Sequence, residues 1–330
     1  MTGAVYDRGY RPYEGSRGGR ASARMALWRA TVRRALGLRR PWRQKVAPFV
    51  LLAIVTVPAI VNVGVKYLTR NTPASELEFI TYRDYVGVSN ALLVFVALTA
   101  PDIICPDRRQ RVLPLIFARP LRGVDYVLAK VGAMAGILFA FSFLPQVVLF
   151  VGQMLVSEDG ALTYLRDNAE VLWQVPAAVA LLAVFYAVIG VAISSLTSRR
   201  IIAGATIVGL FLVSSIVSAV LVGPQAEDVD SGRFEGSATA TSVALPPDVD
   251  ADRQTTDTYY LVRTEPTAAP LVNVAGLPLI LRDVVFLGEV DPSSPMSGLA
   301  NGGAYAAGVY ALIVGGGLLV LLRRYHEVER

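Results

Sequence analysis

The sequence predicts an all-α integral membrane protein with six transmembrane helices. Three observations lead to this fold class: an apolar composition, long apolar runs and an uneven placement of basic residues. Of the 330 residues, 54% are hydrophobic and 17% are charged, which is more apolar than an ordinary soluble domain. A hydrocarbon core about 30 Å thick requires roughly 20 apolar residues in a helix. The runs that meet this length are 46–65, 85–104, 131–156, 171–196, 201–222 and 303–322, the first five of them within 46–222.

Basic residues indicate which way the spans run, because Lys and Arg in short loops and flanks are retained in the cytoplasm. Most of the 31 Lys and Arg residues lie in four segments, which are 1–45, 105–130, 196–201 and 323–330. The loops 66–84 and 157–170 carry few. We therefore predict a multi-pass protein of the cell membrane with both termini in the cytoplasm. Residues 1–20 are expected to be a disordered cytosolic tail, and 323–330 a short cytosolic tail.

Residues 21–45 are predicted to form an amphipathic helix that lies in the membrane interface. Helical periodicity places their apolar residues, Trp28 and Val32 among them, on one face. The expected anchors in the headgroup layer are Trp28, Arg33 and Arg34. The alternative is a basic flank that only sets the topology.

The segment CPDRRQRVLPLIFARPLRGVDYVLAK, residues 105–130, separates the second and third runs. Arginine at the bilayer centre costs roughly 3 kcal/mol, so this segment is predicted to face the cytosol. Asp107 is expected to cap a short helix with apolar and basic side chains on different faces, which is typical of a helix that docks on a partner. A loop folded onto the membrane surface is the alternative. The candidate docking residues are Asp107, Arg108, Arg109, Arg111, Val112, Leu115, Ile116, Arg119 and Pro120.

Residues 223–302 separate the last two runs and are acidic and rich in Thr, Ser, Asp and Pro. This composition agrees with an extracytoplasmic location, as either a small subdomain or a disordered loop. Within the segment, 277–290 is apolar but interrupted by Pro278, Arg282 and Asp283. It is too short to cross a bilayer, so we expect an interfacial or re-entrant piece.

Small and polar residues inside the runs are candidates for contact with a second chain or with a substrate. They are Gly132, Gly136, Gln146, Gln153, Ser214 and Ser218. The two glycines have the GxxxG spacing that lets helices approach closely, but packing within the chain and interhelical hydrogen bonds are the simpler interpretation. Asp102 is predicted to form an ion pair with Arg108 or Arg199 at the edge of the apolar layer.

Cys105 is the only cysteine and His326 the only histidine. An intrachain disulfide is therefore impossible, and a thiolate metal cluster or a His-based catalytic site is not expected. No acidic cluster or G-x-S-x-G motif suggests a membrane-embedded enzyme, and no folded module suggests nucleic-acid binding. We predict no catalytic residue, no metal site and no cofactor bound by this chain.

The run PDIICPDRRQRVLPLIFARPLRGVDYVLAK resembles the loop after the second span in permease subunits of type-2 ABC transporters. The resemblance rests on Asp107 with Arg108, on 115–120, and on Tyr126 with Lys130; GVAISSLTSRR also resembles the end of that family's fourth span. It implies six spans, cytosolic ends and a coupling helix in 105–130 that docks on a separate ABC ATPase subunit. It also implies a second permease chain, identical or homologous, and favours export.

The lysines agree with a separate ATPase, because a phosphate-binding loop requires Gly directly before its Lys. Lys45, Lys66 and Lys130 follow Gln, Val and Ala instead, so ATP and Mg²⁺ are expected on the partner. The chain departs from the family in the length of 223–302, where other members carry a compact re-entrant element. The alternatives are a non-transporting assembly factor or sensor whose extracytoplasmic segment binds a ligand, and, less favoured, a membrane-embedded lipid-modifying enzyme.

Overall fold

In the computed structural model the chain is described at residues 19–37, 42–70, 81–86, 89–118, 121–157, 160–222 and 267–329. Within these ranges every regular element is a helix, so the all-α prediction is confirmed for them. In chain order the helices are α1 (Arg20–Ala35), α2 (Trp42–Thr69), α3 (Tyr82–Tyr85), α4 (Ser89–Arg109), α5 (Leu113–Phe117), α6 (Gly123–Val156), α7 (Ala161–Asp167), α8 (Val171–Leu196), α9 (Arg200–Val222), η2 (Ala269–Val272), α10 (Leu277–Leu287) and α11 (Gly302–Glu329).

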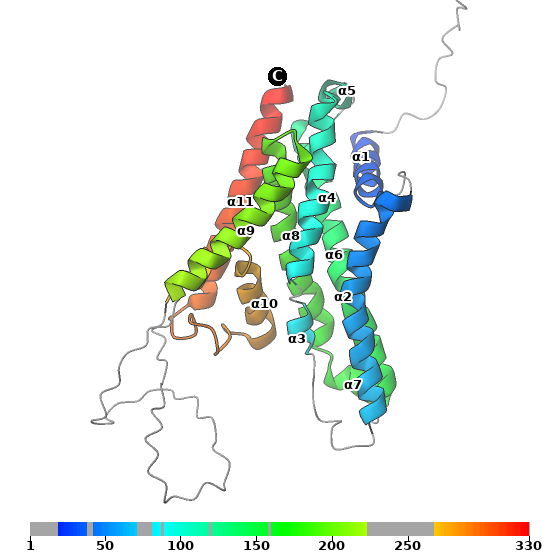
Figure 1. The fold of residues 1–330 in the computed structure, drawn as a ribbon, viewed down its shortest axis with the longest axis vertical. Coiled ribbons are helices and arrows are strands. Elements are labelled where there is room, and N and C mark those ends of the chain that lie inside the picture. Colours follow the sequence, from blue (N-terminus) through cyan, green and yellow to red (C-terminus); the bar gives the residue numbers. More distant parts are fainter. Residues whose placement is uncertain are drawn as a thin grey trace, which may run out of the picture.

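Five of the described helices are long and apolar enough to cross a membrane, which makes this a multi-pass membrane protein. They contain the stretches Phe49–Thr69, Gly123–Val156, Val171–Leu196, Arg200–Val222 and Gly302–His326. Helix α6 has 34 residues and is therefore about 50 Å long, well beyond the ~30 Å of a hydrocarbon core. Helix α4 is not among the five, although its 21 residues run through the bundle between α2 and α8 (Figure 1).

Helix α8 is the centre of the bundle. It packs against α4, α6, α10 and α11, and two thirds of its most apolar stretch is buried. Phe185, Tyr186 and Leu182 are fully buried there, as expected of a helix that is hydrophobic on every side. The outer helices instead expose large apolar side chains, for example Ile54 on α2 and Leu212 on α9. In a bilayer such faces contact lipid tails.

The two ends of the bundle differ in charge. We call the end that carries α5 and the C-terminal part of α11 the basic end, and the opposite end, with α3, α7 and α10, the α10 end (Figure 1). The basic end gathers seven arginines. They are Arg108 and Arg109 in the last turn of α4, Arg111 just after it, Arg199 before α9, Arg200 at the start of α9, and Arg323 and Arg324 on α11. The described parts of the segments that were predicted to be cytoplasmic thus lie at one end.

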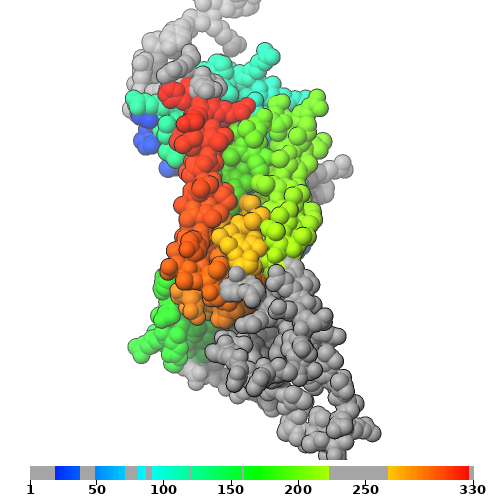
Figure 2. All heavy atoms as spheres, turned by 90° about the vertical axis from the view of Figure 1, so that its left-hand side faces the viewer, coloured from blue at the N-terminus to red at the C-terminus, as the bar shows by residue number. Residues whose placement is uncertain are grey.

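Helix α10 forms a short element between α9 and α11 (Figure 2). Its 11 residues span only about 16 Å, so it does not cross a bilayer. Arg282 and Asp283 are buried at its centre, and Gly288 ends it in the left-handed conformation at φ 78°, which favours glycine. Most of the predicted extracytoplasmic segment, residues 223–266, lies outside the described residues, as do 1–18.

Two predicted boundaries were wrong. The interfacial helix expected over 21–45 ends at Ala35, because Gly37 takes a left-handed conformation at φ 65° and its N–H donates to the Arg34 carbonyl at 3.1 Å. Residues 42–45 belong to α2 instead. The second apolar run was expected to end at 104, but α4 continues to Arg109 and takes Asp107 with it.

Candidate functional site

Asp107 was predicted to cap a separate short helix. It lies instead inside the last turns of α4. Its side chain is buried, and the residue is only 1% exposed. Lys130 Nζ lies 2.6 Å from Asp107 Oδ2, and the Tyr126 hydroxyl donates to the same oxygen at 3.0 Å. The guanidinium of Arg34, from α1, donates to Oδ1. One carboxylate therefore ties α1, α4 and α6 together.

The spacing of the partners on α6 explains how they converge. Tyr126 and Lys130 are four residues apart, so both side chains leave the same face of the helix. Lys130 Nζ also donates to the Ile103 carbonyl at 2.9 Å, which satisfies the buried ammonium group. Two cationic side chains, Lys130 and Arg34, therefore compensate the charge of the buried Asp107 carboxylate.

Helix α4 ends in a turn that leads into α5. The N–H of Val112 donates to the Asp107 carbonyl at 3.1 Å, and the N–H of Arg111 donates to the Arg108 carbonyl at 3.2 Å. This is the hydrogen-bond pattern of a Schellman motif, with Arg111 at φ 53° where glycine is usual. The turn begins at Asp107, so the buried carboxylate also fixes where α5 starts.

Helix α5 is partly exposed. None of its residues is buried, and Leu115 is 72% exposed. Ile116 and Phe117 are half-buried, and the Phe117 ring lies 6.0 Å from that of Tyr126. A cavity of about 340 Å³ separates α5 from α1, with Leu115, Ile116, Asp107 and Lys130 among its lining. Arg119 and Pro120 lie outside the described residues.

The predicted docking arginines do not share one environment. Arg109 and Arg111 are exposed. Arg108 turns inward and donates to the Ser195 carbonyl at the end of α8. Asp102 pairs with Arg200, a partner that the sequence had not suggested, because α9 starts at Arg200 and brings its side chain beside α4.

Helix α1 is bound to the bundle by ion pairs, which corrects part of the predicted anchor. Arg34 was expected to face lipid headgroups, but it pairs with Asp107. At the other end of α1, Arg20 Nε lies 2.6 Å from Asp125 Oδ2 and Arg24 lies 3.8 Å from Oδ1. Asp125 also accepts the Arg122 N–H at 3.0 Å and so caps α6. Arg33 is exposed, and Trp28 is 36% exposed and lies beside Gly136 of α6.

Arg20 and Asp125 were not predicted as site residues. A detectable signal existed for Asp125, because it is the third residue of α6, a position that favours acidic side chains. Arg83 on α3 was not predicted either, and its Nε lies 2.8 Å from Asp283 on α10. No short-range pattern indicates that pair, since 200 residues separate its members.

The small and polar candidates are dispersed over the bundle, and protein groups occupy most of the polar ones. Gly132 and Gly136 are both exposed on α6, but an added Cβ at Gly132 would meet no atom within 4 Å, whereas one at Gly136 would lie 3.8 Å from the Trp28 ring. They therefore do not form one contact surface within the chain.

Hydrogen bonds within the chain account for the remaining candidates. Gln153 donates to Asn62 at 3.4 Å and accepts from Tyr164 at 2.8 Å, while Gln146 donates to the Tyr82 carbonyl at 3.3 Å. Ser214 accepts the Val274 N–H at 3.2 Å, and Ser218 donates to the Ala269 carbonyl at 3.2 Å. These contacts join α6 to its neighbours and α9 to the segment before α10.

Among the described residues, no group of three or more His, Cys, Asp or Glu side chains could hold a metal ion. No known protein family, curated protein or solved structure matches the chain. The class that fold and site define is a multi-pass helical membrane protein with a short exposed helix at its basic end.

Proposed function

We propose that this chain is the membrane permease subunit of an ATP-driven ABC transporter, an exporter that couples through residues 105–130 to a separate ATPase subunit. The observation that carries the proposal is α5, a short helix with exposed Leu115 that projects from the basic end (Figure 1). An exposed apolar side chain on a helix held at a fixed angle suits insertion into a groove of a partner.

The attachment of α5 suits the transmission of force. Its turn starts at Asp107, and Asp107 is bonded to Lys130 on α6 and to Arg34 on α1. A displacement of α5 would therefore move the ends of α4 and α6 together, as in rigid-body switching. Arg109 and Arg111 are exposed beside α5 and supply positive charge toward an acidic partner surface.

The rest of the assembly follows from the same proposal. Helix α4 serves as the sixth span, since 21 residues cover about 31 Å. Both termini and α5 lie in the cytoplasm, in agreement with the basic end. ATP and Mg²⁺ bind to the ATPase and not to this chain, and a second permease chain, identical or homologous, completes the pathway.

The proposal is tested by affinity purification of the tagged wild-type chain from its native membranes, in mild detergent. A protein with a phosphate-binding loop and ATPase activity should co-purify. Leu115→Asp should reduce its recovery roughly tenfold or more, because a charge in the centre of a contact is not compensated. Leu162→Asp is the matched control, since Leu162 is similarly exposed on the short helix α7 at the α10 end.

The two variants should insert into the membrane and unfold at the same temperature as the wild-type chain. Absence of any co-purifying ATPase would refute the permease assignment. Recovery of the ATPase with Leu115→Asp at the wild-type level would refute the role of α5.

A further inference from the structure

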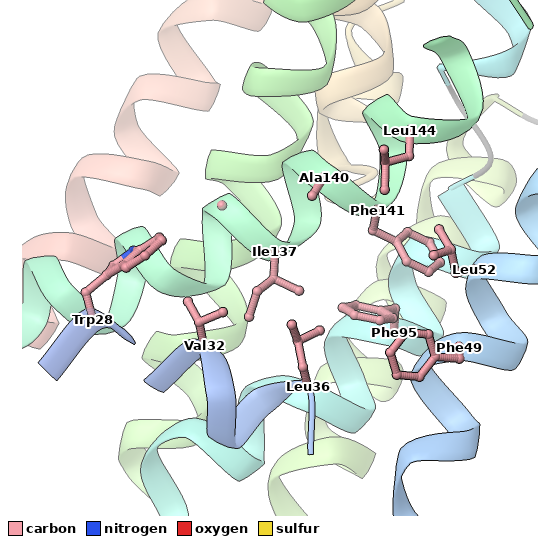
Figure 3. A pocket seen from close by; sticks show the side chains of 11 residues that line it. Trp28, Val32, Leu36, Phe49, Leu52, Phe95, Ile137, Ala140, Phe141 and Leu144 are labelled. Atoms are coloured by element: carbon pink, nitrogen blue, oxygen red, sulfur yellow. The ribbon is translucent and has the colours of Figure 1, made fainter. Parts of the chain in front are cut away.

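An apolar cavity of about 300 Å³ lies between α1 and α2, against α6 (Figure 3). Side chains from all three helices converge on it, together with Phe95 of α4. Those that decide its chemistry are Trp28, Val32 and Leu36 from α1, Phe49 and Leu52 from α2, and Phe141 from α6.

Among the described residues, no charged side chain lines this cavity, and the indole of Trp28 is the only polar side chain that does. Water is not stable in such a space, because it needs two or more polar partners. The volume is about twice that of a ~150 Å³ apolar cavity that accepts benzene, so it can take on the order of a dozen carbon atoms. That is the size of most of one fatty acyl chain.

The cavity is open at its sides. Phe49 and Leu144 are each 51% exposed and Trp28 is 36% exposed. Because α2 and α6 both include stretches able to span a membrane, this opening faces the lipid layer in a bilayer. An acyl chain can therefore enter laterally while its headgroup stays near α1.

The charge on α1 indicates which kind of lipid headgroup would lie at the opening of the cavity. Arg20, Arg24 and Arg34 are engaged with Asp125 and Asp107. Arg29 and Arg33 are exposed and follow Trp28 and Val32 by one residue each, so they leave the helix about 100° round from the cavity-lining face. Along α1, two exposed arginines thus directly follow cavity-lining residues, and their guanidinium groups are free of the Asp107 and Asp125 ion pairs and suited to a phosphate.

We propose that this cavity binds one acyl chain of an anionic phospholipid, whose phosphate pairs with Arg29 and Arg33. The bound chain fills the space between α1 and α2 and supplies the dispersion contacts that the empty lining lacks. With such a site, the packing of α1 against the bundle would depend on the anionic lipid content of the membrane. It does not depend on the coupling role of α5.

The proposal is tested with Trp28 as a fluorescent probe. Trp42→Phe and Trp173→Phe leave Trp28 as the only tryptophan. The full chain is reconstituted in phosphatidylcholine vesicles that contain a small fraction of either acyl-brominated phosphatidylglycerol or acyl-brominated phosphatidylcholine. We expect the anionic lipid to quench Trp28 at a roughly fivefold lower mole fraction, the effect expected for about one arginine at an anionic surface.

The control is a pair of glycines on α6. Gly136→Leu places its side chain in the cavity, whereas Gly132→Leu, one turn earlier, points where no atom lies within 4 Å. We expect the anionic preference to fall to about onefold with Gly136→Leu and to persist with Gly132→Leu. The double variant Arg29→Gln with Arg33→Gln should also lose it.

The unaltered cavity decides the proposal even if a filled variant fails to fold. Equal quenching of Trp28 by both brominated lipids would overturn it. Quenching by neither lipid would overturn it too, because another segment or a second copy would then occupy the cavity. A preference that survives Gly136→Leu would mean general attraction to an anionic surface and no binding site.

Discussion

At the scale of single residues, Asp107 has the largest effect that the contacts predict. Asp107→Asn leaves the ammonium group of Lys130 buried without its counter-charge, since Lys130 is only 2% exposed. Breaking a buried pair on one side costs about 3–5 kcal/mol. We expect a clearly lower midpoint in thermal unfolding of the detergent-solubilised protein.

The double variant Asp107→Leu with Lys130→Met distinguishes the lost charge pair from a packing defect. It removes both buried charges and retains apolar volume, so it should recover most of the lost stability. Arg109→Gln, at an exposed position two residues along α4, should unfold like the wild-type chain. If Asp107→Asn also matches the wild-type midpoint, Asp107 does not hold the helices together.

Two glycines of α9 give a second prediction at this scale. Pro101 has no N–H, so the Ala97 carbonyl lacks its donor within α4, and a Cβ on Gly204 would lie 2.9 Å from that oxygen. A backbone oxygen cannot turn aside as a side chain can. Gly204→Ala should therefore push α9 from α4 and destabilise the protein by about 1–3 kcal/mol.

Gly209→Ala is the matched substitution, because an added Cβ there meets nothing within 4 Å. It should be neutral or stabilising by up to about 1 kcal/mol through helix propensity. Equilibrium unfolding in mixed micelles measures both variants. If both variants change the free energy of unfolding in the same direction, α9 does not approach the Ala97 carbonyl as closely as described.

At the scale of elements, α1 should behave as a helix fastened at its two ends. Arg20 and Arg34 pair with carboxylates that are each only 2% exposed. Arg20→Gln with Arg34→Gln should raise the amide hydrogen exchange of α1 in neutral detergent, roughly fivefold or more, while the centre of α8 stays protected. The reason is that about 1 kcal/mol or more is lost at each partly buried, charge-assisted hydrogen bond.

The comparison variant changes the other arginines of the same helix. Arg29 and Arg33 are exposed, so Arg29→Gln with Arg33→Gln should leave exchange in α1 unchanged when no anionic lipid is present. Equal exchange in the two double variants would show that apolar packing alone holds α1.

The sequence predicts elements of this protein better than it predicts contacts. Long apolar runs identify spans because the bilayer requires them, and the short interrupted run 277–290 did become a helix too short to cross. The position of Asp107 could not be predicted, because a helix that continues past its apolar run depends on Lys130 and Arg34, which lie far away in sequence. Asp107 resembles a cap locally, and tertiary pairing overrides that preference.

At the scale of the whole molecule, the two ends of the bundle differ in their number of basic residues. The short loops at the basic end are rich in arginine, whereas the α10 end uses Arg83 and Arg282 in ion pairs with Asp283. The orientation rule counts basic residues in short loops, so the arrangement of both ends favours the basic end in the cytoplasm.

This orientation predicts which side of the membrane each end reaches. Cys105 is buried, so single cysteines can be introduced as markers. Ser198→Cys lies in the exposed turn between α8 and α9 at the basic end, and Ala161→Cys lies on exposed α7 at the α10 end. A membrane-impermeant maleimide should label Ala161→Cys in intact cells, and Ser198→Cys only in inverted membrane vesicles.

The chain without an introduced cysteine is the control, and it should take up little label from either side. The reverse pattern would invert the topology and place α5 outside the cell, where no ATPase could reach it, and labelling of both markers from one side would mean that the bundle does not cross the membrane.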